Sequence, residues 1–407
     1  MIHKIISQNS NSTFISDLNT VTITGSDEAG RYGTLATPKS LFYNGGTYLT
    51  GRLDATTNNS PYILKWKNGV LEYELVTTLT NPDVLVHPRP AVLIYNDFIY
   101  VIVVNGHGED MQILKSNSAD SIADGFTLLH TVTGDFGYNA CRITTDNRMV
   151  ILTRSTGVTL TPNNSQVVLV SDIDDFTTWS EKLVTDADYG TTLVRHYPSV
   201  PIHYGVNQWN YFGISMRKDS GGSGYVYKQF IYKTQDFITY SNLTETFSKN
   251  VDVSGEITQA ELLANFAITT PTDETKSSAG VNAIVLNDEI YNSYYNYISE
   301  EWYWQHIDSS GVITETLIDL ILPSPVLGQF SLLSMWYNGN NLVHSINNLL
   351  YISNLDFSSL EVITNIELGE SKILPANLDK VDGDYMIGGS LTDNEYYYYT
   401  TNDIFLN

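Results

Sequence analysis

The chain alternates short apolar runs with polar turns, and the spacing predicts β-hairpins. Each unit has an apolar strand, a turn of Asn, Asp or Gly, and a second strand rich in aromatic residues. Seven segments follow this form: 40–53, 91–104, 141–154, 199–217, 282–297, 331–346 and 372–389. Their starts lie roughly 40 to 80 residues apart, a spacing typical of repeat architectures.

A second hairpin is expected after several of the first ones, at 62–76, 166–184, 229–243, 303–318 and 349–363. Two hairpins make a four-stranded blade, so the pattern predicts an all-β protein. A β-propeller of seven four-stranded blades fits best, with six blades as the alternative. Three second hairpins carry Asp then Phe at the turn, in SDIDDFTTWS, KTQDFITYS and SNLDFSS. The first two resemble the Asp-box turns of sialidase-type propellers.

The two ends of the chain are expected to meet. The N-terminal strand at 13–25 and the tyrosine-rich strand at 396–406 are predicted to complete one shared blade and close the ring. Residues 1–407 then form a single domain. The interval 244–281 is long for the repeat and holds the helix-like run ITQAELLANF, which indicates an insertion.

Composition narrows the list of partners. A hydrophobic fraction of 42% is enough for a real core. The net charge of −24 repels phosphate backbones and anionic membranes, so neither nucleic acid nor a membrane is an expected partner. We see no apolar leader and no membrane-spanning run, and expect cytoplasmic synthesis of a protein that either stays in the cytoplasm or is released without a signal, for example with a virion. The single cysteine, Cys141, excludes an internal disulfide and a cysteine-based zinc site.

Ionisable residues recur at two positions of three consecutive first hairpins, where the first strand opens and where its partner strand ends. The three pairs are His87 and His107, Tyr138 and Arg154, and Tyr197 and Arg217. Loops and strand ends of a propeller surround a central channel, so residues at one end of adjacent blades can share a site. This pattern predicts an active site dispersed in sequence.

The same residues carry a resemblance to a known family. HPRPAV, then NGHG, then a Tyr-opening strand that ends in Arg, then YP resemble the seven-bladed propeller polysaccharide lyases of the ulvan lyase type, which are BNR-repeat-like proteins. In that family a DDHN-x-PA strand, an HG turn, a TYP strand and a strand-end Arg line the cleft. The similarity covers about 87 to 217. Leu85–Val86 replaces the acidic pair, Pro88 replaces Asn, and Asn139 rather than Pro follows Tyr138.

The resemblance implies β-elimination on a polysaccharide that contains uronic acid. Arg154 suits neutralisation of the uronate carboxylate, which makes the neighbouring proton acidic. His87 or His107, together with Tyr138, would supply the base and the acid, in an order that stays open. Tyr197 and Arg217 compete with Tyr138 and Arg154 for the family's Tyr–Arg pair.

Three further residues are expected to bind the substrate: Arg89, His196 and Arg217. The expected partner is an anionic polysaccharide. The reaction needs no cofactor and we expect no catalytic metal, although Glu109–Asp110 and Asp172–Asp174–Asp175 leave structural calcium open.

Two other functions compete with the lyase. One is a non-catalytic carbohydrate-binding or receptor-binding propeller of a virion or cell surface. The second is a sialidase-like glycoside hydrolase. Glycoside hydrolases generally need paired carboxylates, for which Glu109 and Asp110 are candidates, whereas a sialidase usually needs an arginine triad.

Overall fold

The computed structural model describes part of the chain, and at some strand positions only its main chain. The described residues are 19–22, 40–52, 60–68, 70–77, 90–104, 109–155, 164–187, 194–205, 208–219, 225–268, 278–279, 283–296, 299–318, 333–337, 341–346, 349–356, 359–362, 376–377, 384–387 and 395–400.

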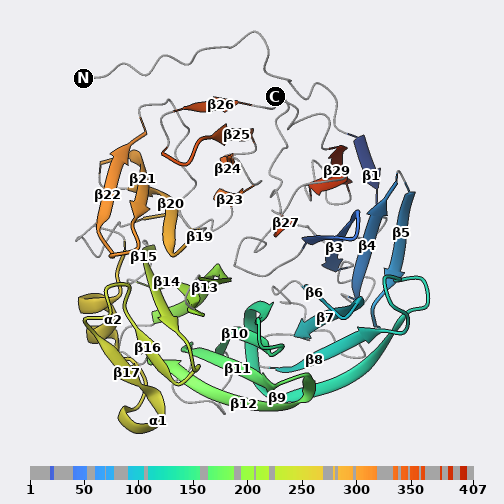
Figure 1. The fold of residues 1–407 in the computed structure, drawn as a ribbon, viewed down its shortest axis with the longest axis horizontal. Coiled ribbons are helices and arrows are strands. Elements are labelled where there is room, and N and C mark those ends of the chain that lie inside the picture. The colour runs from blue at the N-terminus through green and yellow to red at the C-terminus, as the bar shows by residue number, and fades with distance from the viewer. Residues whose placement is uncertain are drawn as a thin grey trace.

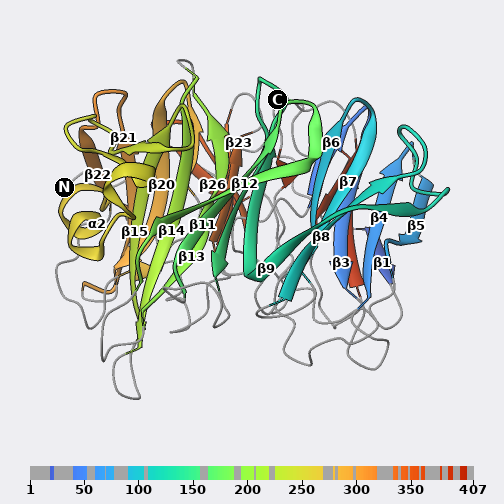
Figure 2. The ribbon, with the colours of Figure 1, turned by 90° about the horizontal axis from the view of Figure 1, so that it is seen from below.

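The described strands form six sheets that lie around a common centre (Figure 1). Strands β10, β13, β19 and β23 lie near that centre, whereas β5, β12, β17 and β22 lie at the periphery. In the perpendicular view the strands run between the two faces of the ring (Figure 2). The predicted all-β fold is confirmed.

The first two sheets in chain order contain twelve strands. One has the order β27-β2-β3-β4-β5, with β2 (Ser40–Tyr43), β3 (Gly46–Arg52), β4 (Pro61–Lys67), β5 (Val70–Leu75) and β27 (Ala376–Asn377). The other runs from β6 to β12, with β6 (Ala91–Tyr95), β7 (Phe98–Val104), β8 (Glu109–Ser116), β9 (Phe126–Ile143), β10 (Met149–Ser155), β11 (Gln166–Asp172) and β12 (Asp175–Thr185).

Two five-stranded sheets follow. The first runs in order through β13 (Val194–Tyr204), β14 (Asn210–Asp219), β15 (Tyr225–Thr234), β16 (Thr239–Ser241) and β17 (Ser248–Asn250). The second holds β18 (Ser278–Ala279), β20 (Glu289–Asn296), β21 (Glu301–Ile307) and β22 (Ile313–Leu317), with β19 (Ile284–Leu286) also paired to β20.

The last two sheets are smaller. One holds β23 (Leu333–Tyr337), β24 (Leu342–Ile346), β25 (Leu349–Ser353) and β26 (Leu360–Val362). The other has the order β1-β29-β28, with β1 (Asn19–Thr22), β28 (Asp384–Ile387) and β29 (Glu395–Thr400). The predicted meeting of the N-terminal strand with the tyrosine-rich C-terminal strand is therefore present, as antiparallel pairing of β1 with β29.

The predicted hairpins are confirmed for all segments except 372–389, the seventh of the first hairpins. At 372–389 the sequence predicts two strands that pair with each other, and for the residues of this segment that the structure describes, 376–377 and 384–387, this is wrong. Strand β27 instead pairs in parallel with β2, and β28 pairs with β29. Alternating apolar residues define a strand but not its partner, and here the partners come from both ends of the chain.

Asn-Gly and Asn-Asp dipeptides form the tight turns that join the two strands of a first hairpin, such as β2 to β3 and β6 to β7. Asn44 and Gly45 have φ of 49° and 73°, and Asn96 and Asp97 have φ of 49° and 65°. Two consecutive residues with positive φ define a type I′ turn, whose twist matches that of the flanking strands. Asn, Asp and Gly tolerate this backbone, which is why these hairpins are legible in the sequence.

The core lies between neighbouring sheets. Val150 and Val168 on β10 and β11 pack in one cluster with Phe212 and Phe230 on β14 and β15. A second cluster joins the sheet of β3 and β4 to β7 and contains Tyr48. Apolar side chains thus join the sheet of β6 to β12 to a neighbouring sheet on each side, which helps to fix the relative positions of their strand ends.

The Asp-Phe turns act as structural caps. The Asp175 carboxylate accepts hydrogen bonds from the Thr177 main chain and hydroxyl at 2.9 and 2.6 Å. The Asp236 carboxylate accepts from the main-chain N–H groups of Ile238 and Thr239 at 2.9 and 2.7 Å. Phe176 and Phe237, next in sequence, are buried. The carboxylate closes the turn and the aromatic ring anchors it.

The predicted insertion contains helices α1 (Val251–Ser254) and α2 (Gln259–Asn265), at the rim beside β16 and β17 (Figure 1). Thr258 and Glu261 form a capping box at the start of α2. Leu262 and Phe266 pack into the core between sheets. Among the described residues, no helix is long and apolar enough to cross a membrane.

Candidate active site

The predicted site residues divide into three groups. His87, Arg89 and His107 lie outside the described residues. Tyr138, Tyr197 and Arg217 have a described main chain, in β9, β13 and β14. Arg154 and His196 are described completely and are both buried, with 4% and 0% of their surface exposed.

A β-bulge brings the Tyr138 main chain opposite Arg154. In the β9–β10 pair Thr153 faces Asn139, but Ser155 faces Phe136. Two residues of β9, at positions 137 and 138, therefore stand across from the single residue Arg154. Bulges of this kind bend a strand and re-aim side chains, and they are over-represented beside active sites. The sequence predicts a shared site here but gives no sign of the bulge.

Gln166 is the partner of Arg154 on the other side. The two residues are directly opposite in the β10–β11 ladder, and Gln166 is fully buried. Beyond them, the Ser155 N–H donates to the Ser165 carbonyl at 3.0 Å, and the Asn164 N–H donates to the Ser155 carbonyl at 2.8 Å. Main-chain bonds on the β11 side thus hold the strand end that carries Arg154, while the bulge lies on its β9 side.

Three polar bonds attach His196 of β13 to the preceding sheet. Its main-chain N–H donates to the Asn164 carbonyl at 2.9 Å, and its carbonyl accepts from Gln166 Nε2 at 2.5 Å. Its ring Nδ1 lies 2.8 Å from Thr185 Oγ1, which also accepts the Gln166 N–H at 3.1 Å. We call Gln166, Thr185 and His196 the sheet clamp. The clamp joins the Arg154 strands to the strand that carries Tyr197.

Burial keeps the His196 imidazole neutral. Removal from water lowers its pKa from 6.5 to about 3, because the buried charged form loses its hydration. A neutral ring with no exposed surface is suited to structural hydrogen bonding. The role of His196 in binding substrate stays a prediction.

The competing pair, Tyr197 and Arg217, has a different register. Arg217 faces Arg195 in the β13–β14 ladder, and Tyr197 faces Ser215. The Tyr197 and Arg217 positions are therefore offset by two residues, whereas the Tyr138 main chain stands across from Arg154 at the bulge. The two candidate Tyr–Arg pairs therefore differ in register.

Two buried polar residues, Thr50 and Arg52, were not predicted from the sequence. Thr50 Oγ1 donates to the Pro90 carbonyl at 2.6 Å, and Arg52 Nη2 donates to the Val104 carbonyl. Arg52 ends β3 as Arg154 comes near the end of β10, so the positional pattern could have found it. These bonds fix the main chain where β6 begins and β7 ends, next to the two histidine-bearing segments in sequence.

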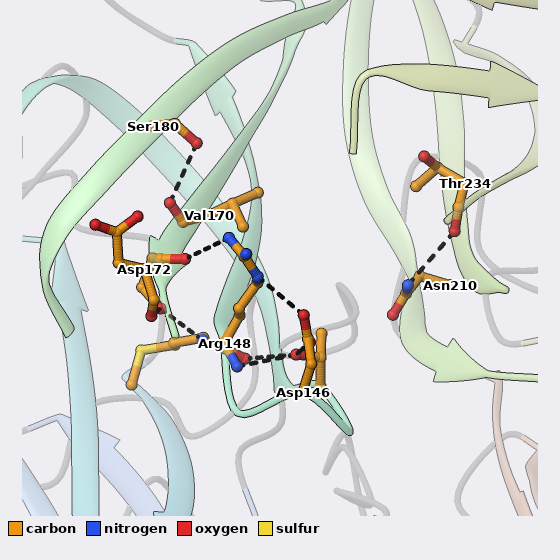
Figure 3. Close-up of polar contacts among 10 residues, drawn as sticks. Asp146, Arg148, Val170, Asp172, Ser180, Asn210 and Thr234 are labelled. Carbon is orange, nitrogen blue, oxygen red and sulfur yellow. Dashed lines mark hydrogen bonds and ion pairs between the residues drawn. The ribbon is translucent and has the colours of Figure 1, made fainter. Parts of the chain in front are cut away.

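The arginine just before the start of β10, Arg148, has different surroundings from Arg154. Arg148, in the β9–β10 turn, donates from Nε to Asp146 at 2.9 Å and from Nη1 to the Ser171 carbonyl at 3.4 Å (Figure 3). The Ser171 hydroxyl accepts the Met149 N–H at 2.8 Å. Arg148 is thus engaged in its own turn, and the two ends of one strand hold arginines with different surroundings.

The candidate carboxylates have structural partners. Asp110 Oδ1 accepts the Gly134 N–H at 2.9 Å, and Glu109, which is exposed, begins β8 opposite Phe136 of β9. Asp174 accepts a hydrogen bond from the Tyr95 hydroxyl, and Asp175 caps its own turn. Within the part of the chain that the structure describes, no three His, Cys, Asp or Glu side chains are grouped as metal ligands would be.

Solved structures of polysaccharide lyases have a fold similar to that of this chain. An ulvan lyase structure described as a new family of polysaccharide lyase matches with a TM-score of 0.67 and 11% identity, over 94% of this chain and 96% of that one. An ulvan lyase bound to -[GlcA(1-4)Rha3S]- matches with a TM-score of 0.66, again at 11% identity and over 94% and 96% of the two chains.

The chain shares the fold of these ulvan lyases. A further polysaccharide lyase structure matches with a TM-score of 0.56 and 10% identity, over 93% of each chain. The resemblance seen over a third of the sequence is thereby confirmed for the fold along nearly its whole length. No family model and no curated protein matches the sequence.

Proposed function

We propose that this protein is a polysaccharide lyase that cleaves a uronic-acid-containing polysaccharide by β-elimination. The observation that carries the proposal is the bulge that sets the Tyr138 main chain opposite Arg154, on a fold shared with ulvan lyases. We propose a virion-associated or released enzyme that acts on surface glycans.

Arg154 has the chemistry for the first step. A guanidinium binds a carboxylate in bidentate fashion, and its positive charge stabilises the enolate-like intermediate after the proton next to the carboxylate is removed. The side chain is 4% exposed. Burial lowers the local dielectric, so the attraction between this cation and a bound uronate is stronger than in water.

Proton transfer is assigned to the remaining members of the set. His87 or His107 and Tyr138 would act as the base and the acid that protonates the leaving glycosidic oxygen, with Tyr197 beside them. Arg89 and Arg217 would bind further anionic groups of the polysaccharide. These groups complete the elimination without a cofactor.

The fold proposed for this enzyme is a single domain, a seven-bladed β-propeller. The support is the seven-stranded sheet, in which the first part of β9 pairs with β8 and its last part with β10. That sheet divides at β9 into two four-stranded units that share this strand, and each of the other five sheets supplies one more unit.

The test is a panel of uronic-acid polysaccharides. A lyase creates an unsaturated uronate, followed by its ultraviolet absorbance, whereas a hydrolase creates reducing ends without that absorbance. We expect Arg154→Lys to lower kcat roughly 100-fold, since loss of one stabilising group for a developing charge has that effect. Arg148→Lys, at the opposite end of the same strand, is the matched control and should keep the wild-type kcat.

Other outcomes identify the rival functions. Reducing ends without absorbance would indicate a glycoside hydrolase. Binding of a polysaccharide with neither product, unchanged in Arg154→Lys, would indicate a binding module. Either result would overturn the lyase proposal.

A further inference from the structure

The sheet clamp lies between two parts of the proposed active site. Arg154 belongs to β10 in the seven-stranded sheet, and Tyr197 belongs to β13 in the next sheet. Strand pairing sets positions within a sheet but not between sheets. Contacts between the sheets must therefore determine how Arg154 and Tyr197 are placed relative to each other.

Apolar packing alone leaves some freedom in that placement. The cluster that joins these sheets includes Val150, Val168 and Ile214, and such contacts are not directional. Hydrogen bonds are directional, and the clamp supplies them within one residue of Tyr197. His196 is engaged through its N–H, its carbonyl and its ring at once.

Gln166 connects the clamp to Arg154. The two residues are opposite each other in the β10–β11 ladder, where facing side chains lie on the same side of the sheet about 5 Å apart. The amide orientation of Gln166 is fixed, because only its NH₂ group can donate to the His196 carbonyl. The Gln166 side chain thus lies beside Arg154 and donates a hydrogen bond to the main chain next to Tyr197.

We propose that Gln166, Thr185 and His196 are positioning residues that set the Arg154 strand against the Tyr197 strand. The inference rests on the proposed function, because it gives Arg154 and Tyr197 a common substrate. His196 then acts through its neighbours and not by contact with the sugar. A displacement of about 1 Å in the placement of reacting groups can cost 100-fold in rate, so a clamp of this kind affects turnover.

The first experiment measures kcat and KM for Gln166→Leu on a polysaccharide that the wild type cleaves. We expect kcat to fall roughly 10- to 100-fold while KM changes by less than about threefold, since the ground-state contacts with the sugar are intact. Gln305→Leu is the matched control. Gln305 is also fully buried and donates to a main-chain carbonyl, that of Ile268 at 2.8 Å, in a different sheet.

Thr185 offers a rescue test within the clamp. Thr185→Ser keeps the hydroxyl that His196 and Gln166 use, and Thr185→Val removes it while keeping the shape. We expect wild-type kcat from the serine variant and a fall from the valine variant. Equal kcat in both variants, or a loss confined to KM, would overturn the positioning role.

Hydrogen exchange tests the clamp without a substrate. In Gln166→Leu the amides of 194–200 should exchange faster, while those of β20 and β21 keep their wild-type rates. If the wild type cleaves no polysaccharide but the exchange changes as expected, the lyase proposal fails and the clamp stands as a link between sheets. Unchanged exchange, together with wild-type kcat in Gln166→Leu, overturns the clamp and leaves the lyase proposal intact.

Discussion

The neutral, buried His196 makes the stability of the fold depend on pH in a calculable way. Its pKa is about 3 in the folded protein and 6.5 when exposed to water. The unfolded chain therefore binds a proton that the folded chain does not, and acid favours unfolding. The contribution is fully present above pH 6.5 and is lost progressively as the pH falls from 6.5 towards about 3.

The size of the effect follows from the difference in proton binding. Each pH unit below the unfolded pKa costs about 1.4 kcal/mol, so lowering the pH from 7 to 5 should remove about 2 kcal/mol of unfolding free energy through His196 alone. His196→Gln removes the titrating group and keeps an amide that can bond to Thr185. We expect the loss between pH 7 and 5 to be about 2 kcal/mol smaller in this variant than in the wild type.

Urea unfolding followed by tryptophan fluorescence, at pH 7, 6 and 5, provides the measurement. Comparison of variant and wild type cancels the titration of the carboxylates that both share. The same pH dependence in His196→Gln and wild type would refute the assignment of a neutral buried ring.

Three further predictions follow from described contacts. Phe212→Ala should cost about 3–5 kcal/mol in urea unfolding, because Phe212 is fully buried and stacks on Tyr232 with ring centroids 5.6 Å apart. Asp236→Ala should cost about 1–2 kcal/mol, since two main-chain N–H groups at its turn lose their acceptor; a thermal midpoint equal to the wild type would contradict the cap. Cys141 is buried, which raises the pKa of its thiol, so a thiol reagent should label it only after urea is added.

The local structure of this protein was legible in its sequence. Alternating apolar residues marked the strands, and Asn-Gly and Asn-Asp steps marked the tight turns, because these residues accept a left-handed backbone. The Asp-Phe turns and helix α2 were found in the same way. All of these signals act over a few residues, so no other part of the chain is needed to read them.

The partners of the strands were decided by the tertiary structure. In the described part of the predicted hairpin at 372–389, β27 pairs with β2 and β28 pairs with β29, and not with each other. Strand β9 continues for 18 residues through what the sequence divided into two repeats. Backbone hydrogen bonds are the same for every partner, so the choice depends on which segments the whole fold brings together.

The candidate site shows the same division. Position along the repeat singled out Tyr138, Arg154 and Tyr197. Only the three-dimensional structure revealed the bulge at Arg154 and the polar bonds that Gln166 makes across two sheets. A bulge is a shift of one residue in register. The hydrogen bond from the Gln166 side-chain amide to the His196 carbonyl joins residues 30 positions apart. Neither leaves a periodic trace in the sequence, because both depend on how neighbouring sheets pack.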